Sequence, residues 1–316
     1  MAHAASARPA AGTPGGSLRR QRPRYGEAII KGVLLAAALV SVATTVGIVI
    51  SLLPPTLRFF ERVGVWEFLT GTEWSALFDP PSYGVLPLVG ATLLITVIAI
   101  AVAVPLGLAA AIYLSEYAHP RTRKVFKPVL EVLAGIPTVV YGFFALAAIT
   151  PLLQDHWPWG EGPEVFNALS AGLVMGVMII PTVASLSEDA MTAVPQSLRQ
   201  GAYALGSTRR IVAIRVVLPA ALSGIVAAVV LAISRAVGET MIVAIASGNR
   251  ANLTWDPLQG MQTMTGYIAQ AGEGDLPIGS FDYTTIFAVG GLLFLLTFIM
   301  NAVSIRLVRR FREVYE

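Results

Sequence analysis

Long stretches without a charged residue constrain this sequence more than any other feature. A stretch at residues 216–249 is interrupted only by Arg235 and Glu239. Five more contain no Asp, Glu, Lys or Arg at all: residues 32–53, 80–115, 132–154, 165–187 and 283–305. Because a helix needs about 20 apolar residues to cross a bilayer, the pattern predicts an all-α membrane protein with six transmembrane helices. The prolines that open the second stretch place its helix at about residues 86–114.

The composition supports a membrane protein and narrows its chemistry. Only 13% of the residues are charged, whereas soluble domains carry about a quarter charged residues. The sequence has no cysteine, and its three histidines are scattered, so we expect neither a disulfide nor a metal site. It contains no GxxxxGKS or GxxxxGKT loop and no HExxH pair. We therefore expect a non-enzymatic chain without a cofactor of its own.

The basic residues lie almost entirely on one side of the predicted membrane. The segment through Lys31, the loops after the second and fourth spans, and the C-terminal tail hold 18 of the 22 Lys and Arg residues. The opposite loops hold only Arg58, Arg62 and Arg250, together with eleven acidic residues. By the positive-inside rule, both termini are cytosolic. We expect a disordered cytosolic tail over residues 1–27 and a six-span domain over residues 28–316.

The cytosolic loop over residues 187–219 is longer than a simple connection requires. Pro195 precedes a helical pattern that Gly206 would end, because glycine readily adopts the left-handed conformation found at helix C-termini. Ser207 or Thr208 then suits the start of a second amphipathic helix, which Pro219 closes. A short helix that lies across the membrane face suits docking to a partner protein.

This loop resembles the EAA loop of bacterial ABC importer permeases. The family pattern is Glu-Ala-Ala, three residues, Gly, nine residues, Ile, one residue and Leu-Pro. In this sequence Gly and Leu-Pro are kept in register, whereas Glu, the first Ala and Ile are replaced. The matching positions are Gln200, Gly201, Ala202, Gly206, Val216, Leu218 and Pro219. The resemblance implies a type I, MetI-like permease core whose loop helix couples to a groove of an ATP-binding subunit.

Two membrane segments resemble those of phosphate permeases. Residues 132–142 read VLAGIPTVVYG and resemble a third-span signature; residues 235–241 read RAVGETM and resemble the fifth-span signature of PstC-type subunits. The resemblance implies import of inorganic phosphate across the bacterial cytoplasmic membrane. It also implies a PstA-type permease, a dimer of ATP-binding subunits that hold ATP and Mg²⁺, and an external phosphate-binding protein. That protein would dock on the loops at residues 54–82 and 247–282.

Two alternatives remain open at this point. Permeases for molybdate and sulfate share a looser Gly-Glu motif in the fifth span, so another oxyanion is the alternative substrate. A membrane scaffold or sensor, which recruits a cytosolic partner through residues 187–219, is the alternative from a different class of function.

Arg235 and Glu239 are charged residues in an otherwise apolar stretch. Spaced four apart, they are predicted to share a helical face, about 24 Å above Pro219 at 1.5 Å per residue. Charges at this depth usually face a bundle interior or a wet cavity. In one interpretation the two residues form an intrahelical ion pair that locks the helix. In the other they contact the anion, Arg235 through its forked donors and Glu239 by accepting a hydrogen bond from a protonated phosphate.

Other polar residues of the spans are weaker candidates for the path. Proline inside a helix kinks it, kinked helices line transporter cavities, and three prolines lie inside predicted spans: Pro105, Pro137 and Pro181. Hydroxyls beside them either serve the path or satisfy backbone groups that the kink frees. The candidate path residues are Arg235, Glu239, Thr240, Thr138 and Tyr141, with Thr182 beside Pro181.

Two glycines of the fourth span predict a close helix contact. Gly172 and Gly176 are spaced as GxxxG, which lets helix backbones approach one another. The contact is expected either within the bundle or against the second permease.

Overall fold

The computed structural model describes residues 25–158, 160–274 and 276–311. The predicted disordered tail therefore lies outside the described residues up to residue 24, and a helix begins at Tyr25. Contacts divide the chain into two units, Met1–Ile50 and Ser51–Glu316. Where it is described, the first unit is helical, and the second unit, which holds the candidate sites, is described by itself.

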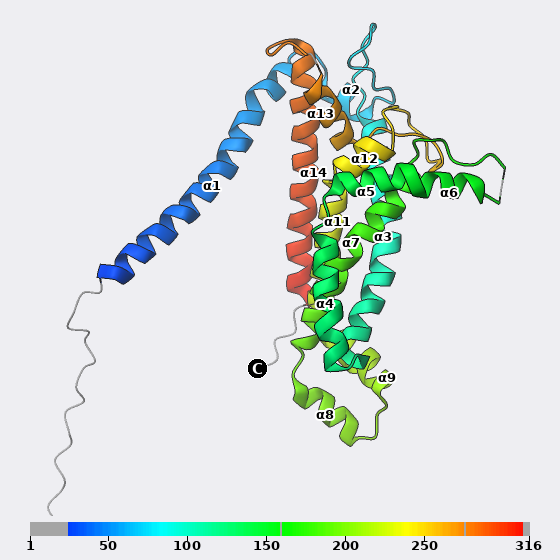
Figure 1. Cartoon of the computed structure of the whole chain (residues 1–316). Coiled ribbons are helices and arrows are strands. Elements are labelled where there is room, and N and C mark those ends of the chain that lie inside the picture. Colours follow the sequence, from blue (N-terminus) through cyan, green and yellow to red (C-terminus); the bar gives the residue numbers. More distant parts are fainter. Residues whose placement is uncertain (1–24, 159, 275, 312–316) are drawn as a thin grey trace, which may run out of the picture. The chain divides into compact units, whose positions relative to one another are not determined.

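Helices make up the described structure (Figure 1). Within the described ranges there is no strand, only an isolated bridge between Trp74 and Tyr83. Three π-helical turns continue helices: η1 Tyr113–Tyr117, η2 Ala145–Ile149 and η3 Ala213–Val217. The α-helices are α1 Tyr25–Phe60, α2 Val65–Thr70, α3 Leu86–Ile112, α4 Pro120–Ala134, α5 Thr138–Phe144, α6 Thr150–Asp155, α7 Ala168–Thr192, α8 Gln196–Ala204, α9 Arg209–Val212, α10 Leu218–Ala220, α11 Leu222–Val237, α12 Met241–Ala246, α13 Met264–Glu273 and α14 Phe281–Phe311.

Among the described residues, five helical segments are long and apolar enough to cross a membrane, and a sixth results if one bent pair counts as a single span. The bent pair, Arg209–Ala220 and Leu222–Val237, turns by 70°. On that count the six predicted spans are confirmed. The other five are Ile29–Phe60, Leu86–Tyr117, Thr138–Asp155, Ala168–Thr192 and Phe281–Arg306.

The first helix runs past its predicted end. Pro54 and Pro55 are predicted to open an outer loop, but α1 continues through them to Phe60. Each proline removes only one backbone donor. Phe59 is fully buried against the rings of Phe68 and Phe281, and this packing holds the last turn of α1 as a helix.

Helices α3 and α7 pack closely along their length. A Cβ atom on Gly172 would lie 2.7 Å from Ile98 Cγ2, and one on Gly176 would lie 2.9 Å from the carbonyl oxygen of Ala99. Neither position leaves room for a side chain, so the GxxxG step brings the two backbones together. The close contact predicted for Gly172 and Gly176 is therefore made within the bundle, against α3.

The remaining helices frame this pair. Helix α11 packs against α7 and α14, and α5 packs against α12. Helices α8 and α9 lie at one end of the second unit, and α12 and α13 lie toward the other (Figure 1). Small and medium-sized apolar residues of α3, α7, α11 and α12 form the core between the two ends.

Candidate functional site

The charged stretch of the fifth span is not a continuous helix. Helix α11 ends at Val237, and α12 begins at Met241 after a break at residues 238–240. The predicted helix through residue 249 is therefore wrong here. Glu239 stabilises the break, because its Oε1 accepts hydrogen bonds from the backbone N–H groups of Met241 at 3.1 Å and Ile242 at 3.3 Å. Backbone groups freed within a membrane need such partners.

The two polar residues of the break serve the backbone. The Glu239 side chain is buried, and its carbonyl oxygen accepts a hydrogen bond from Thr265 Oγ1 of α13 at 2.7 Å. Thr240 Oγ1 donates to the carbonyl oxygen of Gly238 at 3.4 Å. Both hydrogen bonds from the backbone amides end on Oε1 of the Glu239 carboxylate. No described residue forms a hydrogen bond with Oε2.

Arg235 lies in the last turn of α11 and is half-buried. Its Nη1 donates a long hydrogen bond of 3.4 Å to Thr182 Oγ1 of α7. Among the described residues, no carboxylate forms an ion pair with Arg235. The predicted intrahelical ion pair with Glu239 is wrong, because the helix ends between the two residues and a spacing of four no longer places them on one face.

The depth of Arg235 also changes. The 70° bend separates Pro219 from the helix that carries Arg235, so the height is measured from Leu222 instead. Thirteen positions at 1.5 Å each give about 20 Å, against about 24 Å on the uninterrupted helix. This distance is measured along α11 alone, and it is shorter than the hydrocarbon thickness of a bilayer, about 30 Å.

The third span begins later than predicted, after a break between two helices at residues 135–137. Helix α4 ends at Ala134 and α5 begins at Thr138, so Pro137 is the N-cap of α5 and does not lie inside a helix as predicted. Tyr141 Oη donates to the carbonyl oxygen of Leu133 at 3.0 Å. Of the two roles predicted for hydroxyls beside the prolines, this one satisfies a backbone group, at the end of α4. Pro105 and Pro181 do lie inside helices, α3 and α7, as predicted.

The helices that follow the two breaks, α5 and α12, pack against each other. A Cβ atom on Gly142 of α5 would lie 3.0 Å from Ile245 Cδ1 and 3.2 Å from the carbonyl oxygen of Met241, both in α12. Interrupted helices are typical of transport sites. A guanidinium with donors to spare, beside the Thr182 hydroxyl, suits brief contact with an oxyanion: its forked donors match the oxygens, and few contacts allow release.

The predicted helices of the cytosolic loop are present. Helix α8 is followed by Gly206 at φ +79°, which ends the helix as predicted. Thr208, not Ser207, caps α9, and Leu218 and Pro219 form α10. Along the predicted coupling positions of α8, Gln200 and Gly201 are exposed and Ala202 is half-buried.

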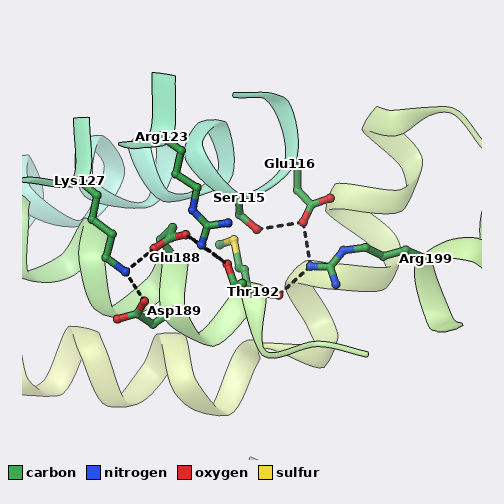
Figure 2. A network of polar contacts seen from close by, with 9 residues as sticks. Ser115, Glu116, Arg123, Lys127, Glu188, Asp189, Thr192 and Arg199 are labelled. Carbon is green, nitrogen blue, oxygen red and sulfur yellow. Dashed lines mark hydrogen bonds and ion pairs between the residues drawn. The ribbon is translucent and has the colours of Figure 1, made fainter. Parts of the chain in front are cut away.

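Arg199 of α8 connects this loop to two spans (Figure 2). Its Nη2 forms an ion pair with Glu116 Oε1 of η1 at 3.0 Å, and both side chains are buried. Nη2 also donates to the carbonyl oxygen of Met191 at 2.7 Å, and Nη1 donates to that of Val194 at 2.5 Å. The guanidinium therefore has acceptors at the ends of both α3 and α7.

A second group of ionic contacts joins α4 to the end of α7 (Figure 2). Glu188 is 1% exposed and forms ion pairs with Arg123 and, at 3.1 Å, with Lys127. Lys127 also pairs with Asp189 at 2.6 Å, and this hydrogen bond raises the pKa of Lys127 above its usual value. Because these charges are satisfied, α7 continues to Thr192, past the predicted start of the loop at residue 187.

A comparison of the sequence with protein families decides the assignment of the chain. Residues 103–313, more than half of the chain, match the profile of the family described as binding-protein-dependent transport system inner membrane component. The chain belongs to this family. It is a multi-pass permease subunit of the ABC importer type, as the resemblance of residues 200–219 implies.

Curated relatives extend the match over most of the permease. The probable ABC transporter permease protein YqgH of Bacillus subtilis is 37% identical over 282 residues, which cover 89% of this chain and 90% of that protein. The phosphate transport system permease protein PstC of Xylella fastidiosa is 32% identical over 310 residues, which cover 92% and 93%. PstC 1 of Mycobacterium bovis is 33% identical over 283 residues, which cover 79% and 83%.

Solved structures show the same fold for the permease. A chain of the bacterial alginate ABC transporter with its periplasmic protein superposes with a TM-score of 0.61 at 15% identity, covering 91% of this chain and 98% of that one. The inward-facing MetNI methionine transporter gives a TM-score of 0.52 at 19% identity, covering 73% and 95%. The predicted all-α, MetI-like permease core is therefore confirmed.

The sequence-based candidates do not include the basic residues that link α4 and α8 to the ends of α7 and α3. Arg199, Arg123 and Lys127 count there only as cytosolic charges. A signal exists in their partners, because Glu116 and Glu188 are acidic residues at span ends on the side of the membrane where basic residues dominate. An acidic residue in that position needs a cation nearby, but the sequence alone does not identify which one.

Proposed function

We propose that this permease subunit moves inorganic phosphate inward across the bacterial cytoplasmic membrane, driven by ATP that a partner subunit hydrolyses. The observation that carries the proposal is the half-buried Arg235 guanidinium, about 20 Å along its helix, whose one described hydrogen bond goes to Thr182. A charge at this depth is costly unless it faces a cavity or a ligand. An anion that passes along α5, α7 and α11 would meet it.

The relatives support phosphate as the anion. Several curated proteins of about this length are named phosphate transport system permease protein PstC, at 30–33% identity over most of this chain. Residues 132–142 and 235–241 carry the resemblance to phosphate permeases, and each segment contains a break between two helices.

Arg235 and Glu239 have different roles in this proposal. Arg235 attracts the oxyanion through its forked donors. Glu239 first fixes the start of α12 through Oε1. Its other oxygen is an acceptor, and a carboxylate accepts hydrogen bonds only. It would welcome a phosphate that still carries a proton and repel sulfate, which carries none at neutral pH. Thr240 and Tyr141 shape the path by hydrogen bonding to backbone carbonyls beside it, and Thr138, the first residue of α5, is the remaining proposed path residue.

The partners follow from the same proposal. A PstA-type permease would complete the membrane path, and a dimer of ATP-binding subunits, with ATP and Mg²⁺, would dock on α8. An external phosphate-binding protein would deliver phosphate to the loops around residues 54–82 and 247–282. The basic end that holds α8 would face the cytosol, with both termini on that side, and this chain would hold no cofactor.

Uptake by the reconstituted complex tests the proposed substrate. Proteoliposomes that contain both permeases and the ATP-binding subunits, with binding protein added outside, are supplied with radiolabelled phosphate. We expect ATP-dependent uptake that excess unlabelled phosphate suppresses and that equal sulfate or molybdate leaves unchanged. Equal competition by sulfate or molybdate contradicts phosphate as the substrate. Phosphate uptake that persists at the full rate without ATP contradicts the ATP-driven mechanism.

A deletion in the same complex distinguishes the permease from the alternative of a membrane scaffold or sensor. Removal of α8 by deletion of residues 196–204 should abolish copurification of the ATP-binding subunits, since α8 is their proposed docking element. Unchanged copurification after this deletion would contradict docking of the ATP-binding subunits on α8, and would favour a membrane scaffold or sensor in which this loop recruits a different cytosolic partner.

A further inference from the structure

Arg199 is the polar anchor of α8. Its side chain is buried, and it donates to three acceptors at once: the carbonyl oxygens of Val194 and Met191 and the carboxylate of Glu116. The carbonyl of Met191 belongs to the last turn of α7, and it also accepts a hydrogen bond from the backbone N–H of Val194 at 3.2 Å. Glu116 belongs to η1, the continuation of α3. One side chain of α8 thus holds the ends of two spans.

The other contacts of α8 are looser. Leu198 and Ala202 pack partly against the apolar cluster at this end. A Cβ atom on Gly201 would meet no atom within 4 Å, and Leu205 is 88% exposed. Apolar contacts are not directional, so they let α8 slide. Charge-assisted hydrogen bonds from one planar fork fix both distance and orientation.

The two spans held by Arg199 border the candidate path. Helix α7 runs without a break from Met191 back to Thr182, about 14 Å at 1.5 Å per residue. Thr182 is the residue that accepts a hydrogen bond from Arg235. Helix α3 follows α7 because Gly176 leaves no gap between them. A displacement applied at Arg199 therefore reaches the surroundings of Arg235 through a rigid, packed pair of helices.

We propose that Arg199 is a positioning residue that makes α3 and α7 move together with α8 when the ATP-binding subunits move. This inference rests on the proposed function, because it requires that α8 docks on those subunits. The geometry of the fork matters, and not only the charge. Two of the three acceptors are backbone carbonyls, those of Met191 and Val194. An ion pair between positions 116 and 199 alone therefore does not replace the hydrogen bonds to these carbonyls.

A charge swap separates this role from a simple ion pair. In the double variant Glu116→Arg with Arg199→Glu, an ion pair between the two positions can form again. Glutamate at position 199 has no donor for the carbonyls of Met191 and Val194, so the connection to α7 is lost. A lysine at position 199 keeps the charge but presents it as a point and not as a planar fork.

The experiment uses the complete transporter, reconstituted with its ATP-binding subunits and binding protein. The variants are Arg199→Lys, the charge swap and Glu116→Gln, with Lys124→Ala as control. Lys124 is an exposed cation of α4 for which the structure describes no ion pair. Two quantities are measured: copurification of the ATP-binding subunits, and the number of phosphate ions imported per ATP hydrolysed.

We expect all variants to copurify with the ATP-binding subunits at the wild-type level. Phosphate imported per ATP should fall about tenfold in Arg199→Lys and in the swap, the factor that corresponds to one charged hydrogen bond. It should fall only about two- to threefold in Glu116→Gln, which keeps an acceptor oxygen in place, and stay unchanged in Lys124→Ala.

Three results overturn the inference. A wild-type ratio in the swap shows that the ion pair alone is sufficient. A fall of import and ATP hydrolysis together at a constant ratio, or loss of the ATP-binding subunits from Arg199→Lys, shows that Arg199 only stabilises the assembly. If the wild-type complex imports another oxyanion, the proposed substrate is wrong, and the same ratio is then measured with that oxyanion.

Discussion

Two arginines of the same chain, Arg199 and Arg235, lie in opposite situations. Arg199 is buried with a carboxylate and two carbonyls as partners. Arg235 is half-buried, with one long hydrogen bond to a hydroxyl and no ion pair among the described residues. Both are charges outside bulk water. Only the first has the acceptors that a buried guanidinium needs from its own chain.

This difference assigns the two residues different kinds of work. A buried ion whose donors are satisfied cannot take a ligand without losing its partners, so Arg199 is suited to holding helices. A guanidinium with free donors within a membrane is costly to keep, and it is suited to a ligand that comes and goes. Loss of Arg199 should therefore reduce stability and coupling, whereas loss of Arg235 should reduce transport.

The largest expected effect is on stability. Arg199→Ala leaves the Glu116 charge buried without its partner, which costs about 3–5 kcal/mol for a broken buried pair. Arg235→Ala removes no ion pair and should cost about 1 kcal/mol or less. Thermal unfolding of the purified complex in detergent measures both, with Lys124→Ala as the surface control. Equal losses in the two arginine variants would remove the contrast on which the two roles are based.

A smaller effect is expected at the break that Glu239 caps. Glu239→Ala removes the acceptor for the amides of Met241 and Ile242, and loss of a helix cap costs about 1 kcal/mol. Glu239→Gln keeps an acceptor oxygen and should leave stability unchanged, yet it should weaken the preference for phosphate over sulfate. Thermal unfolding and competitive uptake measure the two properties separately. Wild-type selectivity in Glu239→Gln would leave Glu239 with its capping role alone.

The smallest effect is expected at the α4 contacts. Lys127 is partly exposed, so Lys127→Ala should cost only about 0–1 kcal/mol. The hydrogen bond to Asp189 raises the pKa of Lys127 above 10.5. A raised lysine pKa gives a contribution that is complete below the unfolded value and is lost as pH rises through the folded one. The difference in unfolding temperature between wild type and Lys127→Ala should therefore be constant from about pH 6 to 9; a difference that varies in this range contradicts the assignment.

The sequence predicts long apolar helices well, and also helices that end at a residue with a clear conformational preference. The charge-free stretches correspond to spans, and Gly206 ends α8 as expected, because a left-handed residue leaves a local signal. The breaks near Pro137 and Glu239 are not predicted. Both depend on partners distant in sequence or in the next turn: Leu133 for Tyr141, and Met241 and Thr265 for Glu239. The pairing of Arg199 with Glu116 is not predicted for the same reason, since 83 positions separate the two residues.

Uptake by Arg235 variants tests the central claim most directly. Radiolabelled phosphate uptake is measured for wild type, Arg235→Lys and Arg235→Gln in complexes of equal stability and equal content of ATP-binding subunits. We expect uptake to fall about tenfold or more in Arg235→Gln, which has lost the charge, and by less in Arg235→Lys, which keeps the charge but not the fork. Wild-type uptake in both variants would contradict the assignment of Arg235 to the phosphate path.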